Sequence, residues 1–327
     1  MHGLELDSNL KLSISTREDR ALKKNNVRVR VTSCGICGTD NHIINGESRV
    51  TLPVILGHEF GGIVEEIGSE VRALRSGDFA AINPNIPCGS CEYCQEGKIH
   101  LCKNLIAIGV DVDGGMSDHC VVPESQVYKL PSSFNLSNLP FVEPLSCVLH
   151  GLDRIDVKHG EKVLIIGAGT IGLMFIMLIR EIAGELSVDE TVPARLERAI
   201  TVGGTGNSID KSEYFDAVLE CSGTIAGLEK AIRSAKRGGR ILIFGVTPKG
   251  SSISLYPNEV YNKELAILGS YVNPHTFPRS IDLIANKKIY LSELKLKTFA
   301  LKNYVEAFEA SRSGMYSKVA FIFEDVD

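Results

Sequence analysis

The sequence predicts an α/β protein with a β-rich first domain and a doubly wound parallel sheet in the second. The chain has 327 residues, which is long for one hydrophobic core. Up to about residue 147, short apolar runs such as Val27–Val31 are separated by glycine, proline and aspartate, the pattern of many short strands. From Gly160 onward, apolar strands alternate with helical segments, which is typical of a parallel sheet covered on both faces.

The individual elements follow this division. In the first part, strand-like runs occupy residues 27–31 and 61–68. In the second, a buried strand, a glycine turn and a helix fill residues 162–184, followed by a strand at 215–223, a helix at 226–239 and a strand at 240–246. The tail ends in the strand-like KVAFIFE, residues 318–324. We expect one domain over residues 1–147, with 285–327 returning to it, and a second over 148–284.

Composition and charge exclude several classes of protein. The net charge of −5 argues against a nucleic-acid surface, which needs clustered lysine and arginine. No apolar run approaches the roughly 20 residues that cross a bilayer. The start of the chain lacks the basic and apolar regions of a secretory signal. We therefore expect a cytoplasmic protein, whose nine cysteines are thiols or metal ligands rather than disulfides.

A glycine turn follows the first strand of the second domain. Gly167, Gly169 and Gly172 form G-x-G-x-x-G between the strand KVLII and a helix. The first glycine permits a tight turn, the second lets a pyrophosphate approach the backbone, and the third allows close helix packing. The helix N-terminus attracts the anion. The context predicts a dinucleotide site.

An acidic residue at the end of the next strand indicates which dinucleotide binds. Asp189 lies 22 residues after Gly167, where it would accept hydrogen bonds from a ribose 2′-hydroxyl. A 2′-phosphate would face both Asp189 and Glu190, so NAD is favoured over NADP. Arg195 is the counter-argument, and we include it in the site. The other predicted cofactor contacts are Thr170, Ile171, Cys221, Gly245 and Ser270.

Four cysteines form a compact run. Cys88, Cys91, Cys94 and Cys102 are spaced C-x2-C-x2-C-x7-C. Four thiolates in a short lobe suit a closed, structural zinc site. An iron–sulfur cluster is the alternative, although the last spacing is longer than in the common bacterial run. Unrelated free thiols are the remaining interpretation.

The stretch SCGICGTDNHI, residues 33–43, leaves Cys34 and Cys37 near other metal-binding residue types. LGHEFGG supplies His58 and Glu59, and FVEPLSCVLHG supplies Glu143. Cysteine, histidine and a carboxylate leave room for a water or substrate on a metal, the pattern of a catalytic site. A redox dithiol is the alternative, but a strand and a glycine-rich loop are not its usual setting.

The order of these motifs carries a resemblance. GICGTD, GHEFGG, the four-cysteine run, an EP motif and GAGTIG resemble the zinc-dependent medium-chain dehydrogenases over almost the whole chain. Among them the polyol dehydrogenases of sorbitol and arabinitol type are most similar, with threonine dehydrogenases next. The resemblance implies a GroES-like catalytic domain and a Rossmann coenzyme domain. It also implies that Cys37 and His58 bind the catalytic zinc, with Glu59 and Glu143 as carboxylates, one of them a direct ligand.

The same resemblance implies a proton relay and a reaction. Thr39 would take the substrate proton and His42 would pass it on, while Asp40 would orient His58. The implied enzyme carries two zinc ions, one catalytic and one structural, and transfers a hydride from a secondary alcohol, of polyol or sugar-alcohol type, to NAD. The alternatives are an L-threonine 3-dehydrogenase-like enzyme and a non-catalytic NAD- and zinc-binding protein. A homodimer or homotetramer is expected, built by RILIFGV and ISLYPNEV extending a sheet, with no nucleic-acid or membrane partner.

Three features depart from the polyol branch. Residues 184–216 are compressed, with a very short second strand. Val272 and Asn273 stand where sorbitol-type members place an arginine and a tyrosine against the sugar alcohol, and Ile44 replaces a common tyrosine. Because these groups would bond distal hydroxyls, a site without them should discriminate differently. We do not expect sorbitol to be the substrate.

Overall fold

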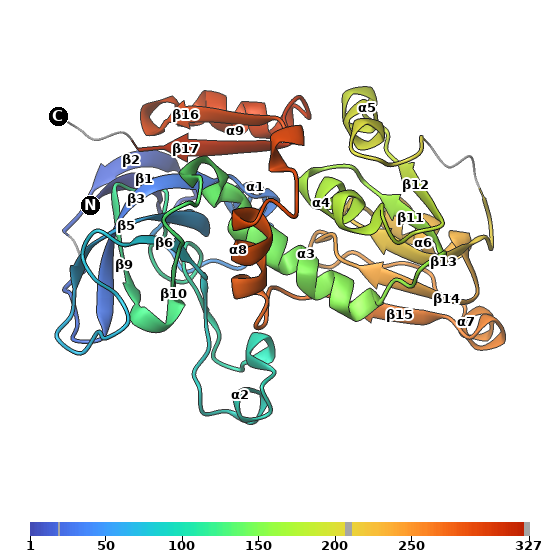
Figure 1. Ribbon diagram of the computed structural model, residues 1–327, viewed down its shortest axis with the longest axis horizontal. Helices are drawn as coiled ribbons and strands as arrows, with labels where there is room; N and C mark the ends of the chain where they lie inside the picture. Colours follow the sequence, from blue (N-terminus) through green and yellow to red (C-terminus); the bar gives the residue numbers. More distant parts are fainter. Residues whose placement is uncertain (19, 207–210, 324–327) are drawn as a thin grey trace. The chain divides into compact units, whose positions relative to one another are not determined.

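The computed structural model describes residues 1–18, 20–206 and 211–323. The chain divides into two compact units (Figure 1). The first contains Met1–Ser146, Asn273–Lys288 and Leu296–Asp327, and the second contains Cys147–Val272 and Ile289–Lys295. The sequence placed the return at residue 285. The structure has it at Asn273, because the helix α8 (Phe277–Ala285) buries Phe277, whose ring lies 4.7 Å from that of Tyr128 in the first unit.

The first unit is rich in β-strands, as predicted. One sheet has the order β10-β6-β5-β3-β17-β16, with β9 also pairing with β3, and a smaller sheet has the order β2-β1-β4. The strands are β1 (His2–Leu6), β2 (Leu12–Thr16), β3 (Asn26–Gly35), β4 (Val54–Ile55), β5 (Glu59–Ile67), β6 (Phe79–Ile82), β7 (Asn85–Ile86), β8 (Ile106–Ala107), β9 (His119–Pro123), β10 (Val127–Lys129), β16 (Leu296–Ala300) and β17 (Lys318–Ile322). The helices are α1 (Gly38–Ile44), α2 (Glu92–Gln95), α8 and α9 (Tyr304–Arg312).

The central strand β3 brings both ends of the chain together. Its apolar residues alternate with polar ones, and Val27, Val29 and Val31 are buried, as period-2 patterning requires. β5 pairs with it antiparallel, opposing Glu59 to Gly35. β17 pairs on its other side, opposing Phe321 to Cys34. The three strands therefore meet at the end of β3, where the cysteine motif begins.

The second unit is a five-stranded parallel sheet, which confirms the predicted doubly wound architecture. Its order is β12-β11-β13-β14-β15. The first strand, β11, lies between β12 and β13, so chain connections leave it in opposite directions, the arrangement at which such sheets bind ligands. The elements are β11 (Lys162–Ile166), α4 (Thr170–Ile179), β12 (Glu185–Asp189), α5 (Pro193–Thr201), β13 (Phe215–Glu220), α6 (Ile225–Ser234), β14 (Ala235–Ile243), α7 (Pro257–Lys263) and β15 (Ala266–Gly269), while α3 (Val142–Ile155) begins in the first unit.

Two local expectations were wrong. The second strand, β12, has five residues and is as long as β11. Beyond it the compressed region keeps a parallel bridge between Ser187 and Thr205, and its residues 207–210 lie outside the described part. ISLYPNEV forms no strand, because Pro257 begins α7 within it and proline suits the first turn of a helix.

Across the described ranges, no helix is long and apolar enough to span a membrane.

Candidate metal and cofactor sites

The cysteine motif, the histidine motif and one carboxylate come together at the end of β3. Cys37 precedes α1, and His58 and Glu59 stand where β5 begins. One ligand atom from each of these three residues lies within 4.8 Å of the others. Sulfur, imidazole nitrogen and carboxylate oxygen are the donors that zinc takes in catalytic sites. The three predicted ligands thus form a compact group that fits a zinc ion.

A buried carboxylate supports the histidine of this group. Asp40 is fully buried, and its Oδ2 accepts a hydrogen bond of 2.8 Å from the Cys37 backbone N–H. Its Oδ1 lies 3.5 Å from His58 Nδ1. Burial opposes a charge on the imidazole, but the charges of Asp40 and Cys37 outweigh burial and raise the pKa of His58 well above its ordinary value. The group is therefore rich in negative charge, which a divalent cation would balance.

A lysine that the sequence gave no reason to notice lies against the same group. Lys318, the first residue of β17, forms an ion pair with Oε2 of Glu59. The side chains of Lys318 and Glu59 are only 4% and 2% exposed. Burial lowers the pKa of Lys318, but the negative charges of Glu59 and Cys37 outweigh burial, so the net shift is upward. Each of these two buried side chains therefore has the other as its ion-pair partner.

The fourth predicted ligand lies outside the compact group. Glu143, in the first turn of α3, is 8% exposed and is not among the ligand atoms gathered within 4.8 Å. Its backbone carbonyl accepts a hydrogen bond of 2.6 Å from the Ser146 hydroxyl, which in turn accepts one of 2.7 Å from the Asn273 amide. Asn273 also accepts from the Asn85 amide at 2.8 Å. Asn273, which stands where sorbitol-type members carry a residue against the sugar alcohol, is thus buried and hydrogen-bonded to Ser146 and Asn85.

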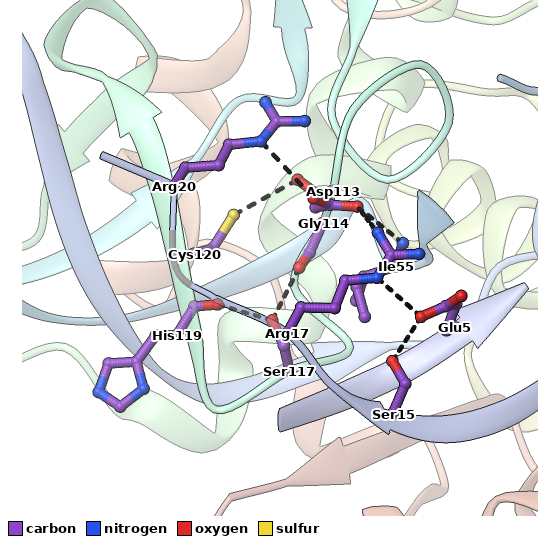
Figure 2. A network of polar contacts seen from close by, with 10 residues as sticks. All are labelled: Glu5, Ser15, Arg17, Arg20, Ile55, Asp113, Gly114, Ser117, His119 and Cys120. Carbon is purple, nitrogen blue, oxygen red and sulfur yellow. Dashed lines mark hydrogen bonds and ion pairs between the residues drawn. The ribbon is translucent and has the colours of Figure 1, made fainter. Parts of the chain in front are cut away.

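A polar network holds the strand that leads to His58. Figure 2 shows Asp113 at its centre, where its Oδ1 accepts from the Ile55 backbone N–H at 3.0 Å and from Arg17 at 3.3 Å. Arg17 also donates a hydrogen bond of 2.7 Å to Glu5. This bond lowers the pKa of Glu5, although burial of the carboxyl acts in the opposite direction. Two residues further on, the Gly57 carbonyl accepts from Gly115 at 2.9 Å. These hydrogen bonds at Ile55 and Gly57 therefore fix the backbone just before His58.

The residues predicted to relay a proton lie on α1. Thr39 is half-buried in the first turn of this helix. His42 lies one turn further on, and its Nδ1 is 2.6 Å from Oε2 of Glu47. Glu47 was not predicted, although it follows His42 by only five residues.

The four-cysteine run folds into a compact lobe around α2. One sulfur from each of Cys88, Cys91, Cys94 and Cys102 lies within 4.8 Å of the others. The Cys94 sulfur lies 3.6 Å from that of Cys91 and 4.0 Å from that of Cys88. Hydrogen bonds from the backbone N–H groups of Ser90 and Cys91 lower the pKa of Cys88 to about 5, whereas burial raises the pKa of Cys94 to about 12. Four sulfurs this close fit one tetrahedral zinc ion, which would stabilise all of them as thiolates.

The glycine turn has the geometry that its sequence predicts. Gly167 has φ = +92°, and a Cβ there would lie 2.8 Å from the Ser222 nitrogen. A Cβ on Gly172 would lie 2.0 Å from the Gly167 carbonyl oxygen, whereas Gly169 faces open space. No side chain caps α4, the helix that follows. The backbone N–H groups of its first turn, at Thr170 and Ile171, therefore fit the pyrophosphate of a dinucleotide.

The two acidic residues at the end of β12 have different partners. Asp189 forms an ion pair of 2.9 Å with Lys230 of α6. Glu190 accepts backbone hydrogen bonds of 2.8 Å from Ala168 in the glycine turn and from Val192. Glu190 therefore fixes the backbone of the glycine turn, whereas Asp189 pairs with a lysine. Arg195 is half-buried on α5.

The other predicted cofactor contacts follow neighbouring strands at one edge of the sheet. Cys221 donates its backbone N–H to Ile166 at 2.8 Å, and Gly245 donates to Glu220 at 2.9 Å. Ser270 donates to Ile243 at 3.1 Å, and its buried hydroxyl has no partner within the described part of the chain. The carboxyl ends of β13, β14 and β15 thus bring these residues to the same edge as the glycine turn.

Comparison with known proteins identifies the family. Residues 23–132 match the alcohol dehydrogenase GroES-like domain, and residues 165–286 match the zinc-binding dehydrogenase domain. The chain is 28% identical to D-arabinitol dehydrogenase 1 of Uromyces fabae, covering 90% of this chain and 89% of the relative. It is 30% identical to L-threonine 3-dehydrogenase of Vibrio parahaemolyticus, covering 92% of both.

A solved structure extends the comparison to the whole fold. A protein of Sinorhizobium meliloti 1021 described as a zinc-binding dehydrogenase, crystallised with NADP, has a TM-score of 0.93 and 33% identity, covering 98% of this chain and 99% of that one. The two units and their motifs define a dehydrogenase that uses zinc and a nicotinamide cofactor. The chain belongs to the zinc-dependent medium-chain dehydrogenases.

Proposed function

We propose that this protein oxidises a secondary alcohol, of polyol or sugar-alcohol class, to the ketone and transfers the hydride to NAD. The observation that carries the proposal is the compact group of Cys37, His58 and Glu59. Zinc, when bound there, supplies Lewis-acid chemistry that eases deprotonation of the alcohol. The relative named D-arabinitol dehydrogenase supports the polyol class.

The chain's own residues have three tasks in this reaction. Cys37, His58 and Glu59 hold the metal, and Asp40 orients His58 through its Nδ1, a contact that metal-bound histidines usually make. Thr39 accepts the hydroxyl proton and passes it toward His42, which releases it to solvent. Residues at the carboxyl edge of the parallel sheet bind and orient the nicotinamide cofactor.

The two glutamates have different roles in this proposal. Glu59 is the direct ligand, because it belongs to the compact group, and Lys318 forms an ion pair with its Oε2. Glu143 lies outside that group and would reach the metal through water. The four-cysteine lobe holds the second, structural zinc, which gives two zinc ions per chain.

A substrate panel tests the proposed class. Purified protein with NAD is mixed with pentitols, hexitols, vicinal diols, simple secondary alcohols or L-threonine, and NADH is followed by absorbance. We expect the highest kcat/KM with a polyol other than sorbitol. A preference for threonine would move the function to that of the Vibrio relative, and no turnover with any alcohol, with NAD and zinc bound, would contradict the proposal.

Asp189 is expected to set the preference for NAD. Its carboxylate would accept hydrogen bonds from the ribose 2′-hydroxyl while Lys230 offsets part of its charge. Replacing Asp189 by serine should lower kcat/KM for NAD about tenfold or more, since a charged hydrogen bond contributes about 1.5–3 kcal/mol. The same change should raise kcat/KM for NADP. Steady-state kinetics with both cofactors measure this, and an unchanged ratio would show that Asp189 does not read the ribose.

We also propose that the protein is a homodimer joined through the edge of the parallel sheet. β15 is the last strand of that sheet, and the segment that precedes it in the chain contains Leu255, Tyr256 and Tyr261, which are 43%, 69% and 80% exposed. Exposed apolar side chains and a strand at the edge of a sheet suit pairing with a second copy. Sedimentation equilibrium should give twice the chain mass of 35.5 kDa or a multiple of it, and a monomer at every concentration would rule the dimer out.

A further inference from the structure

We infer that Glu47 is a positioning residue that sets the tautomer of His42 for proton transfer. The inference rests on the proposed function, in which His42 passes the substrate proton to solvent. It assigns a task to a residue outside the motifs described above. The observation that carries it is the contact of 2.6 Å between His42 Nδ1 and Glu47 Oε2.

The chain is shaped to make this contact. α1 ends at Ile44, and Gly46, with φ = +73°, turns the chain back toward the helix. The Glu47 backbone N–H then donates to the His42 carbonyl oxygen at 2.8 Å. Glu47 is thus tied to His42 through both its backbone and its side chain, which is more constraint than a pair of long surface side chains normally has.

The contact decides which nitrogen of His42 accepts a proton. An ionised carboxylate only accepts hydrogen bonds, so the imidazole must carry its hydrogen on Nδ1 when it bonds Glu47. Nε2 is then the nitrogen with a free lone pair. After a proton reaches Nε2, the ring is an imidazolium that still donates Nδ1–H to Glu47, and the proton leaves again from Nε2 to water. The carboxylate stays ionised throughout, as in other histidine sites oriented by a carboxylate.

Charged groups on neighbouring elements are occupied elsewhere. Arg312 of α9 donates to the Asn41 side chain at 3.1 Å, and Arg49 bonds Asp111 at 2.7 Å. Within the described ranges, the charged side chain that pairs with the His42 ring is that of Glu47. The side chains of His42 and Glu47 are 29% and 42% exposed, so the pair also borders the solvent that receives the proton.

Nitrogen NMR tests the tautomer without relying on turnover. The protein is labelled with ¹⁵N at histidine, and His42 is assigned by comparison with His42→Gln among the eight histidines. Above the pH at which the ring is charged, His42 should carry its proton on Nδ1 in the wild type and become a mixture of tautomers in Glu47→Ala. A wild-type His42 protonated on Nε2, or a pattern unchanged in Glu47→Ala, would overturn the inference.

Kinetics then test whether the tautomer matters for the reaction. Glu47→Ala removes the acceptor that holds the hydrogen on Nδ1, so kcat should fall about tenfold, part of the hundredfold or more that a positioned acid–base group contributes. The KM for NAD should not change. Glu66→Ala is the matched control, because Glu66 is an exposed carboxylate of the first unit paired with Arg28 at 3.2 Å, and it should leave kcat unchanged.

The outcomes separate the inference from the function on which it rests. If wild-type protein oxidises no alcohol, the proposed function fails, whatever the tautomer of His42. If the wild type turns over, His42→Gln is slow and Glu47→Ala is as fast as the wild type, the proposed relay stands and the role of Glu47 is contradicted.

Discussion

Replacing Cys37 by alanine is expected to lower kcat/KM for the alcohol at least about a thousandfold, because a Lewis-acid metal contributes several kcal/mol and each 1.4 kcal/mol is a factor of ten. The variant should retain one zinc ion per chain, held by the four-cysteine lobe, where the wild type holds two. Loss of one ligand from the three-residue group leaves His58 and Glu59, and two donors do not hold zinc in the required geometry.

A neighbouring cysteine gives a matched control. Cys34 lies three residues before Cys37 and is fully buried, and burial raises the pKa of its thiol well above the ordinary value. A buried neutral thiol packs as a small apolar group. Cys34→Ala should therefore keep two zinc ions and near wild-type turnover, at a cost of about 1 kcal/mol in stability for the lost volume. Metal analysis by mass spectrometry, together with NADH assays, distinguishes the two variants, and equal zinc content in both would contradict the ligand assignment.

Replacing Lys318 by methionine is expected to destabilise the metal-free protein by about 3–5 kcal/mol, the cost of leaving a buried charge without its partner. The charge left behind is that of Glu59, whose side chain is 2% exposed. Zinc bound by Cys37, His58 and Glu59 would balance part of this charge. The zinc-loaded variant should therefore lose less stability than the metal-free variant does.

Chemical unfolding with and without zinc measures this difference. Lys263→Met is a suitable control, because Lys263 is 10% exposed but its partners Glu213 and Glu259 are 44% and 30% exposed. Exposed partners stay solvated when the lysine is lost, so the control should cost no more than about 1 kcal/mol with or without zinc. Equal losses in the two metal states of Lys318→Met would show that Lys318 and the zinc ion do not share Glu59.

Local patterns in the sequence predicted the parts of the site that depend on a few consecutive residues. The turn at Gly167 needs a positive φ and close backbone approach, which only glycine supplies, so the pattern and the geometry agree. The four sulfurs of the lobe come from a run of 15 residues and meet as the spacing indicates. The order of strands and helices likewise predicted the parallel sheet.

Contacts set by strand order could not be predicted in this way. Lys318 meets Glu59 only because β17 and β5 flank β3, although the two residues are 259 positions apart. The pairing of Asp189 with Lys230 likewise depends on how α6 packs within the second unit. Glu47 is different, because it lies five residues after His42 and beyond a helix-ending Asn-Gly, a local signal that could have been used.

The most direct test of the account is zinc-dependent hydride transfer. NADH formation is measured with the best polyol from the panel, then after removal of metal with a chelator, and again after zinc is added back. We expect turnover to fall to background with the chelator and to return with zinc, while NAD still binds to the metal-free protein. Turnover that persists in protein shown to contain no zinc would contradict a mechanism centred on Cys37, His58 and Glu59.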